Sequence, residues 1–87
     1  MKFILLNHLK IQAKERDISI GLIEDALSNP EQIVPDLKGL MAAHKKYFDT
    51  ENKKEYLIRV IFREEHAVRI GITVYKTSKI KKYWRLE

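Results

Sequence analysis

Two neighbouring stretches of alternating residues constrain the fold of this chain more than any other feature. In 55–63 and again in 68–75, every second side chain is apolar or aromatic. A period of two residues is typical of a β-strand with one buried face. Residues 64–67 would turn the chain back, so the sequence predicts an antiparallel strand pair. The two apolar sets are Tyr56, Ile58, Val60 and Phe62, and then Val68, Ile70, Ile72 and Val74.

The register of this pair follows from keeping both apolar sets on one side of the sheet. A slip of one residue turns every side chain of a strand to the opposite face. A loop of three or five residues aligns the sets and pairs Arg63 with Arg69, and Arg59 with Thr73. We therefore expect a loop of odd length. The second face would then carry Arg59, Arg63, Arg69, Thr73 and Tyr75.

A cationic segment with aromatic residues follows the second strand. Ile80, Tyr83 and Trp84 are spaced i, i+3, i+4, and lysine or arginine occupies most positions around them. This spacing predicts a short helix with Ser78 as its N-cap. Strand, turn and basic helix together would form a surface suited to an anion.

The distribution of charge adds to this expectation. The net charge is +5, yet residues 1–43 hold five Lys/Arg against six Asp/Glu, and residues 44–87 hold twelve against six. Such asymmetry is typical of proteins with a polyanionic partner. The alternative is a solvated basic face whose arginines pair with acids such as Glu55, Glu64 and Glu65.

Length and composition predict one domain spanning 1–87. The chain has no cysteine, which fits a cytoplasmic protein, and no apolar stretch near the roughly 20 residues of a membrane span. We expect a cytoplasmic location and no membrane association.

The first half reads as strand, helix, helix. Lys2–Leu6 is a short apolar run, Asn7 can cap a helix from residue 8, and Ser19 can cap a second helix that stops at Asn29-Pro30. Ile33-Val34 is a possible edge strand, and 45–49 is a strand candidate. The predicted class is α+β: a strand, two N-terminal helices, an antiparallel sheet of three to four strands, and a short C-terminal helix.

Several short motifs are spread along the chain: His8, Arg16, Ile18-Ser19, Asn29-Pro30 and Thr73-Val74-Tyr75. Together they resemble the family catalogued as domain of unknown function 4258, and the chain departs from that family's pattern at Leu9, Gln12 and Asp17. The order of elements also resembles small toxins of the RelE and BrnT kind.

The resemblance implies a RelE-like α+β domain that binds and cleaves RNA by metal-independent transesterification and is neutralised by a cognate antitoxin. No cofactor is implied. Such an endoribonuclease needs a proton acceptor, a proton donor and cations for the phosphate. Five residues are candidates for these roles: His8 as base, Arg16 as phosphate clamp, Arg59 and Arg69 at the transition state, and Tyr75 as donor or stacking ring.

RNA contacts are expected from Arg63, Thr73, Lys76, Lys79, Lys81 and Lys82. Purely structural roles remain open for several candidates: His8 as a structural residue at the helix start, Arg16 in an ion pair, and Tyr83 and Trp84 as core packing. Three isolated histidines lack the spacing of a metal site, and His44 and His66 receive no role. The alternative function is a non-catalytic basic module that binds nucleic acid or an acidic partner protein.

Overall fold

The computed structural model describes residues 2–86; Met1 and Glu87, the ends of the expected 1–87 domain, lie outside them. The α+β class predicted from the sequence is confirmed. In chain order the elements are β1 (Lys2–Leu5), α1 (Asn7–Glu15), α2 (Ile20–Ser28), β2 (Gln32–Pro35), the 3-10 turn η1 (Leu37–Gly39), β3 (Met41–Asp49), β4 (Lys54–Glu65), β5 (Val68–Thr77) and α3 (Ile80–Tyr83).

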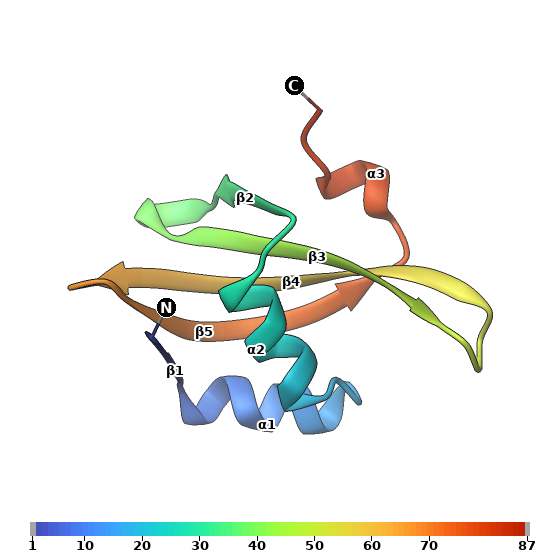
Figure 1. Cartoon of the computed structure of the whole chain (residues 1–87), viewed down its shortest axis with the longest axis horizontal. Coiled ribbons are helices and arrows are strands. Elements are labelled where there is room, and N and C mark those ends of the chain that lie inside the picture. The colour runs from blue at the N-terminus through green and yellow to red at the C-terminus, as the bar shows by residue number, and fades with distance from the viewer. Residues whose placement is uncertain (1, 87) are drawn as a thin grey trace.

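The strands form one five-stranded sheet in the order β1-β5-β4-β3-β2. The four strands after the helices are antiparallel neighbours, and β1 adds a fifth, parallel to β5. Figure 1 shows α1 along the β1–β5 side and α2 in front of the strands, with α3 apart from both, beyond the end of β5. Both longer helices have nine residues, and no helix in 2–86 is long and apolar enough to cross a membrane.

The main core lies between the sheet and the helices α1 and α2. Burial of apolar area supplies most of the driving force for folding. Gly71 lets α1 approach β5 closely, because a Cβ there would lie 2.9 Å from Leu9 Cδ1. The buried core residues are Leu9, Ala13, Ile18, Ile23, Ala26 and Leu27 from the helical region, and Ala43, Ile58, Val60, Phe62 and Val74 from the strands.

The opposite face of the sheet, which we call the far face, is only partly apolar. Val34, Ala42 and Ile61 form a small buried cluster there. Two residues further along β3 and β4, the same face carries the buried polar residues His44 and Arg59. The sequence predicted a basic second face, and the structure places Arg59 on that face as a buried residue.

The predicted register of β4 and β5 is wrong. The loop has two residues, His66 and Ala67, both with positive φ (52° and 63°), as in the tight turns that match strand twist. A β-bulge between Ile61 and Phe62 then absorbs one residue. In consequence Arg59 pairs with Tyr75 rather than Thr73, and Arg63 pairs with Ile70 rather than Arg69.

Local details correct the predicted ends of several elements. Ser19 caps α2, as predicted, and accepts a hydrogen bond from the Leu22 amide over 3.1 Å. Asn7 is the first residue of α1 and makes no cap, and the residue before α3 is Lys79 rather than Ser78. The third strand begins at Met41, four residues before the predicted start at Lys45.

Candidate nucleic-acid interface

The Arg59 guanidinium is the centre of a buried polar cluster on the far face. Its Nε donates to Nε2 of His44 over 2.9 Å, and its Nη1 donates to the Tyr75 hydroxyl. Its Nη2 lies 3.8 Å from Oδ1 of Asp36. The sheet register creates this cluster, because His44, Arg59 and Tyr75 are direct partners across β3, β4 and β5.

His44 is fully buried, and both ring nitrogens have partners. Because Nε2 accepts from Arg59, the ring proton belongs on Nδ1, which lies 3.1 Å from Oε1 of Gln32. Burial, with the adjacent Arg59 charge, lowers the pKa of His44 from 6.5 to about 4. The ring is therefore neutral at pH 7 and serves Arg59 as an acceptor.

The Tyr75 phenol is also held in its neutral form. Burial raises its pKa, and the charge and hydrogen bond of Arg59 only partly offset that effect. The hydroxyl accepts from Arg59 and keeps its own proton, so it can still donate to a further group.

The C-terminal segment covers this cluster. The Arg59 Cζ lies 4.4 Å from the Tyr83 ring centroid, and the Trp84 ring lies 6.1 Å from the His44 ring at 30°. Oε1 of Gln32 accepts from the Arg85 amide over 3.0 Å, and Nε2 of Gln32 donates to the Arg85 carbonyl. Both aromatic rings are half-buried and lie against polar groups, and neither joins the apolar core clusters, so the expectation of core packing is not met.

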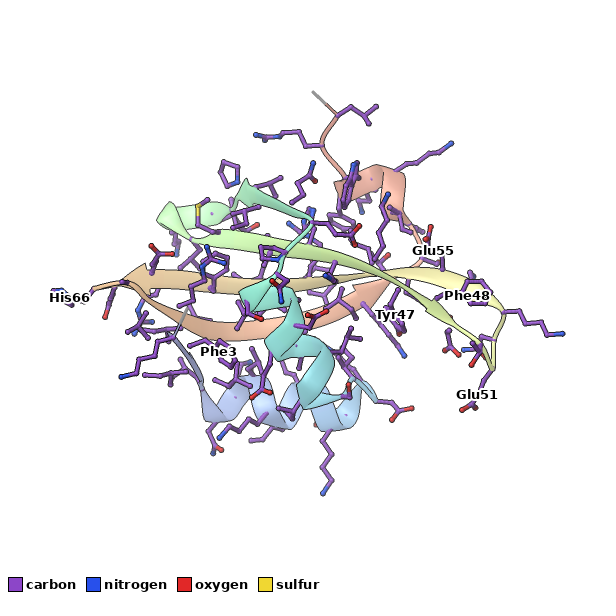
Figure 2. The ribbon with its side chains drawn as sticks, in the orientation of Figure 1. Phe3, Tyr47, Phe48, Glu51, Glu55 and His66 are labelled. Carbon is purple, nitrogen blue, oxygen red and sulfur yellow. The ribbon has the colours of Figure 1, made fainter. Side chains whose placement is uncertain are left out.

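A groove that we call the α3 groove separates α3 from the ends of β3 and β4. Within residues 2–86, no carboxylate forms an ion pair with any of its lysines. Among the described residues, the one acidic residue that lines it is Glu55, which Figure 2 labels close to α3. The residues that matter for charge and stacking are Lys46, Lys79, Lys81, Lys82 and Trp84.

Two predicted catalytic residues lie away from the α3 groove. His8 is exposed in the first turn of α1. Arg16 Nη1 donates to the Val74 carbonyl over 2.6 Å, where Gln12 Oε1 accepts from the Val74 amide over 3.1 Å. Strand β1 pairs with β5 only as far as Gly71, so the Arg16 and Gln12 side chains satisfy the backbone groups of Val74 on the edge beyond it. The contact is structural, but it is a hydrogen bond to a backbone carbonyl and not the ion pair expected as the alternative for Arg16.

Arg69 lies on the helical side of the sheet, not beside Arg59. Its Nη1 donates to the Leu27 carbonyl over 2.6 Å, its Nε lies 3.2 Å from Glu64, and its Cζ lies 5.3 Å from the Phe62 ring centroid. Leu27 is near the C-terminus of α2, where carbonyls lack helical partners and attract cations. The bulge and the two-residue turn moved Arg69 off the predicted face.

The predicted RNA-contact residues divide into two groups. Lys79, Lys81 and Lys82 lie on the α3 groove. The others have different surroundings: Arg63 pairs with Glu65 over 3.0 Å, the Thr73 hydroxyl donates to Gln12, and Lys76 Nζ lies 5.4 Å from the Tyr56 ring centroid, beside Ile58 on the helical side of the sheet.

Sequence reasoning missed His44, Gln32 and Lys46. His44 lies one residue before the predicted strand start at Lys45, so the prediction gives it no partner across the sheet. Extending the alternation back to Met41 would have placed Ala43 in the core and His44 on the opposite face, beside Arg59.

The described residues include no group of three His, Asp or Glu side chains placed to hold a metal ion. Comparison of the chain with family models, with curated proteins and with solved structures finds no match. The site must therefore be interpreted from its own geometry.

Proposed function

We propose that this chain binds RNA along the α3 groove. The observation that carries the proposal is a set of four lysines around one half-buried tryptophan, with no ion-pair partner for them among residues 2–86. Lysines that border an aromatic ring provide the two elements of single-stranded RNA binding, phosphate attraction and base stacking. The charge excess of residues 44–87 and the sequence resemblance both support this choice of ligand.

The proposal predicts a specific dependence on salt. Each phosphate contact to a single strand contributes about −0.7 to the slope of log affinity against log salt. Four lysine contacts give a slope of about −2.8, so affinity should fall about 50-fold between roughly 50 and 200 mM salt. Fluorescence anisotropy with a labelled RNA oligonucleotide measures this slope directly.

Matched double variants separate the groove from general basic charge. Lys81→Ala/Lys82→Ala removes two cations from the α3 groove, and Lys10→Ala/Lys14→Ala removes two exposed cations from α1. The groove variant should make the slope shallower by about 1.4, whereas the α1 variant should leave it unchanged. Equal effects of the two variants would refute the assignment of binding to the groove.

A cleaving version of the proposal has one favourable observation, the meeting of Arg59 and Tyr75 with His44. However, His44 is fully buried and both of its nitrogens are engaged, so it cannot take a ribose proton while α3 stays in place. We therefore favour binding over cleavage. Incubation of the folded protein with RNA, without metal, followed by mapping of product ends, tests this preference. Cut ends made by the wild type and absent with an Arg59→Met protein that circular dichroism shows to be folded would establish cleavage.

The proposed partner protein would act on the same surface. The resemblance implies a neutralising antitoxin, and an acidic segment is the chemistry that the lysines of the α3 groove would attract. We expect such a protein to compete with RNA, and the competition should disappear in Lys81→Ala/Lys82→Ala. An acidic protein that binds the groove while RNA does not would favour the protein-binding alternative.

A further inference from the structure

Trp84 has two neighbours from β3, a buried imidazole and a lysine, and this arrangement is the basis of the inference. The centroid of the His44 ring lies 6.1 Å from that of the Trp84 ring, and the two ring planes are tilted by 30°. Lys46, from β3, holds its ammonium 4.1 Å from the indole centroid. The imidazole is buried and fixed by its hydrogen bonds, whereas the ammonium sits at the end of a flexible side chain on the α3 groove.

We propose that Trp84 is a stacking platform for one unpaired nucleobase, and that Lys46 leaves the indole for an adjacent phosphate when RNA binds. The inference rests on the proposed function and makes it specific to single strands. In the free protein the lysine occupies the ring by a cation–π contact between two half-buried side chains. A nucleobase offers the ring a larger stacking partner, and the displaced ammonium gains an anion.

The single-strand requirement follows from the geometry of nucleic acids. A paired base is covered by its neighbours in the helical stack, so it presents no free face to a protein ring, whereas an unpaired base can be splayed out. Lys79, Lys81 and Lys82 are exposed around the same groove and can attract the phosphates on either side of the stacked base.

The ring is held in position before any ligand arrives. Gln32 bonds to His44 and also to both backbone groups of Arg85, the residue that follows Trp84. Arg85, on one side of Trp84 in the chain, is thereby held to β2 and, through Gln32, to β3. Tyr83, on the other side, packs on Arg59. Such a fixed platform loses little conformational entropy on binding.

Trp84 is the sole tryptophan of the chain, so its emission reports directly on the platform. The experiment titrates the full chain with an unlabelled eight-nucleotide single-stranded RNA and, separately, with duplex RNA of equal length. We expect the single strand to quench Trp84 with the midpoint that anisotropy gives, and the duplex to bind without quenching. Equal quenching by the duplex would overturn the single-strand inference.

Variants measure the contribution of each group. Trp84→Leu should weaken single-strand binding roughly 10- to 100-fold, whereas Trp84→Phe, which keeps an aromatic face, should lose less than about tenfold. Lys46→Ala should still be quenched by RNA but should have a salt slope shallower by about 0.7. Lys10→Ala, on α1, is the matched control and should match wild type in both measurements.

The outcomes separate this inference from the function beneath it. Salt-dependent RNA binding with unchanged Trp84 emission, and equal affinity of Trp84→Leu, would overturn the stacking platform while leaving RNA binding in place. Absence of RNA binding at low salt, by protein that circular dichroism shows to be folded, would overturn both. The wild-type quenching measurement needs no variant, so a Trp84→Leu protein that fails to fold does not block the test.

Discussion

Replacement of Arg59 by methionine tests whether the buried polar cluster is a structural unit. The variant keeps much of the side-chain volume and removes every donor. His44 Nε2 is then left as a buried acceptor, which costs about 1–3 kcal/mol, and the contact with Tyr83 is lost, at about 1–2 kcal/mol. Asp36 is only half-buried and can regain water, and the guanidinium no longer has to be desolvated, which offsets part of the loss. We expect a net destabilisation of about 3 kcal/mol, a large share of the 5–15 kcal/mol typical of a domain.

Urea denaturation followed by far-UV circular dichroism measures this loss, and Arg63→Met is the matched control. Arg63 is exposed, and within residues 2–86 its ion pair is with the exposed Glu65, so its replacement should cost less than about 1 kcal/mol. A double variant, Arg59→Met/His44→Leu, removes both partners of the central hydrogen bond and should regain at least about 1 kcal/mol relative to the sum of the single variants. An Arg59→Met protein as stable as Arg63→Met, or additive single losses in the double variant, would refute the reasoning.

Three further predictions concern pH, packing and the edge of β5. The pKa of His44 is about 4 in the folded protein and near 6.5 in the unfolded chain, so the unfolded chain binds the proton first and the free energy of unfolding should fall by up to about 3 kcal/mol between pH 6.5 and 4. Chemical denaturation at a series of pH values should show this decrease for the wild type and not for His44→Gln. Gly71→Ala should destabilise by about 1–3 kcal/mol, because its Cβ would contact core side chains at 2.9–3.4 Å. Gly21→Ala in α2, with nothing within 4 Å of its Cβ, should instead stabilise by about 0.5–1 kcal/mol, so thermal melts should show a lower Tm for the first variant and a higher Tm for the second. Arg16→Ala should lower the free energy of unfolding by about 1 kcal/mol through the lost bond to the Val74 carbonyl, yet leave RNA affinity measured by anisotropy unchanged; a large loss of affinity at unchanged stability would restore Arg16 as a phosphate clamp.

The elements of this fold could be predicted from the sequence because their signals are local. The alternation around Val60 and Val74 fixed two strands, and the hydroxyl of Ser19 fixed the start of a helix. The predicted register failed because its determinants leave little trace in the sequence. His66 and Ala67 adopt positive φ without glycine or asparagine, and a bulge compensates for the short turn.

The candidate site was only half predictable for the same reason. Arg59 and Tyr75 were expected on one face, and the structure pairs them directly. His44 and Gln32 come from β3 and β2, and their contacts depend on a register that no local pattern specifies. Gln12 shows the reverse case: it departs from the family pattern, and the structure gives it a role at the edge of β5.

The position of the polar cluster explains how so short a helix can hold a defined place on the sheet. A helix of four residues cannot form alone, because nucleation is costly and so few residues cannot repay it. Apolar packing would hold α3 against the sheet without fixing its orientation, whereas hydrogen bonds are directional. Gln32 fixes the Arg85 backbone, and Arg59 lies under the Tyr83 ring, so the segment between them has one defined position. That position sets the lysines and the indole of the α3 groove, and the polar cluster on the far face is therefore what the proposed binding surface, built on a single helical turn, requires.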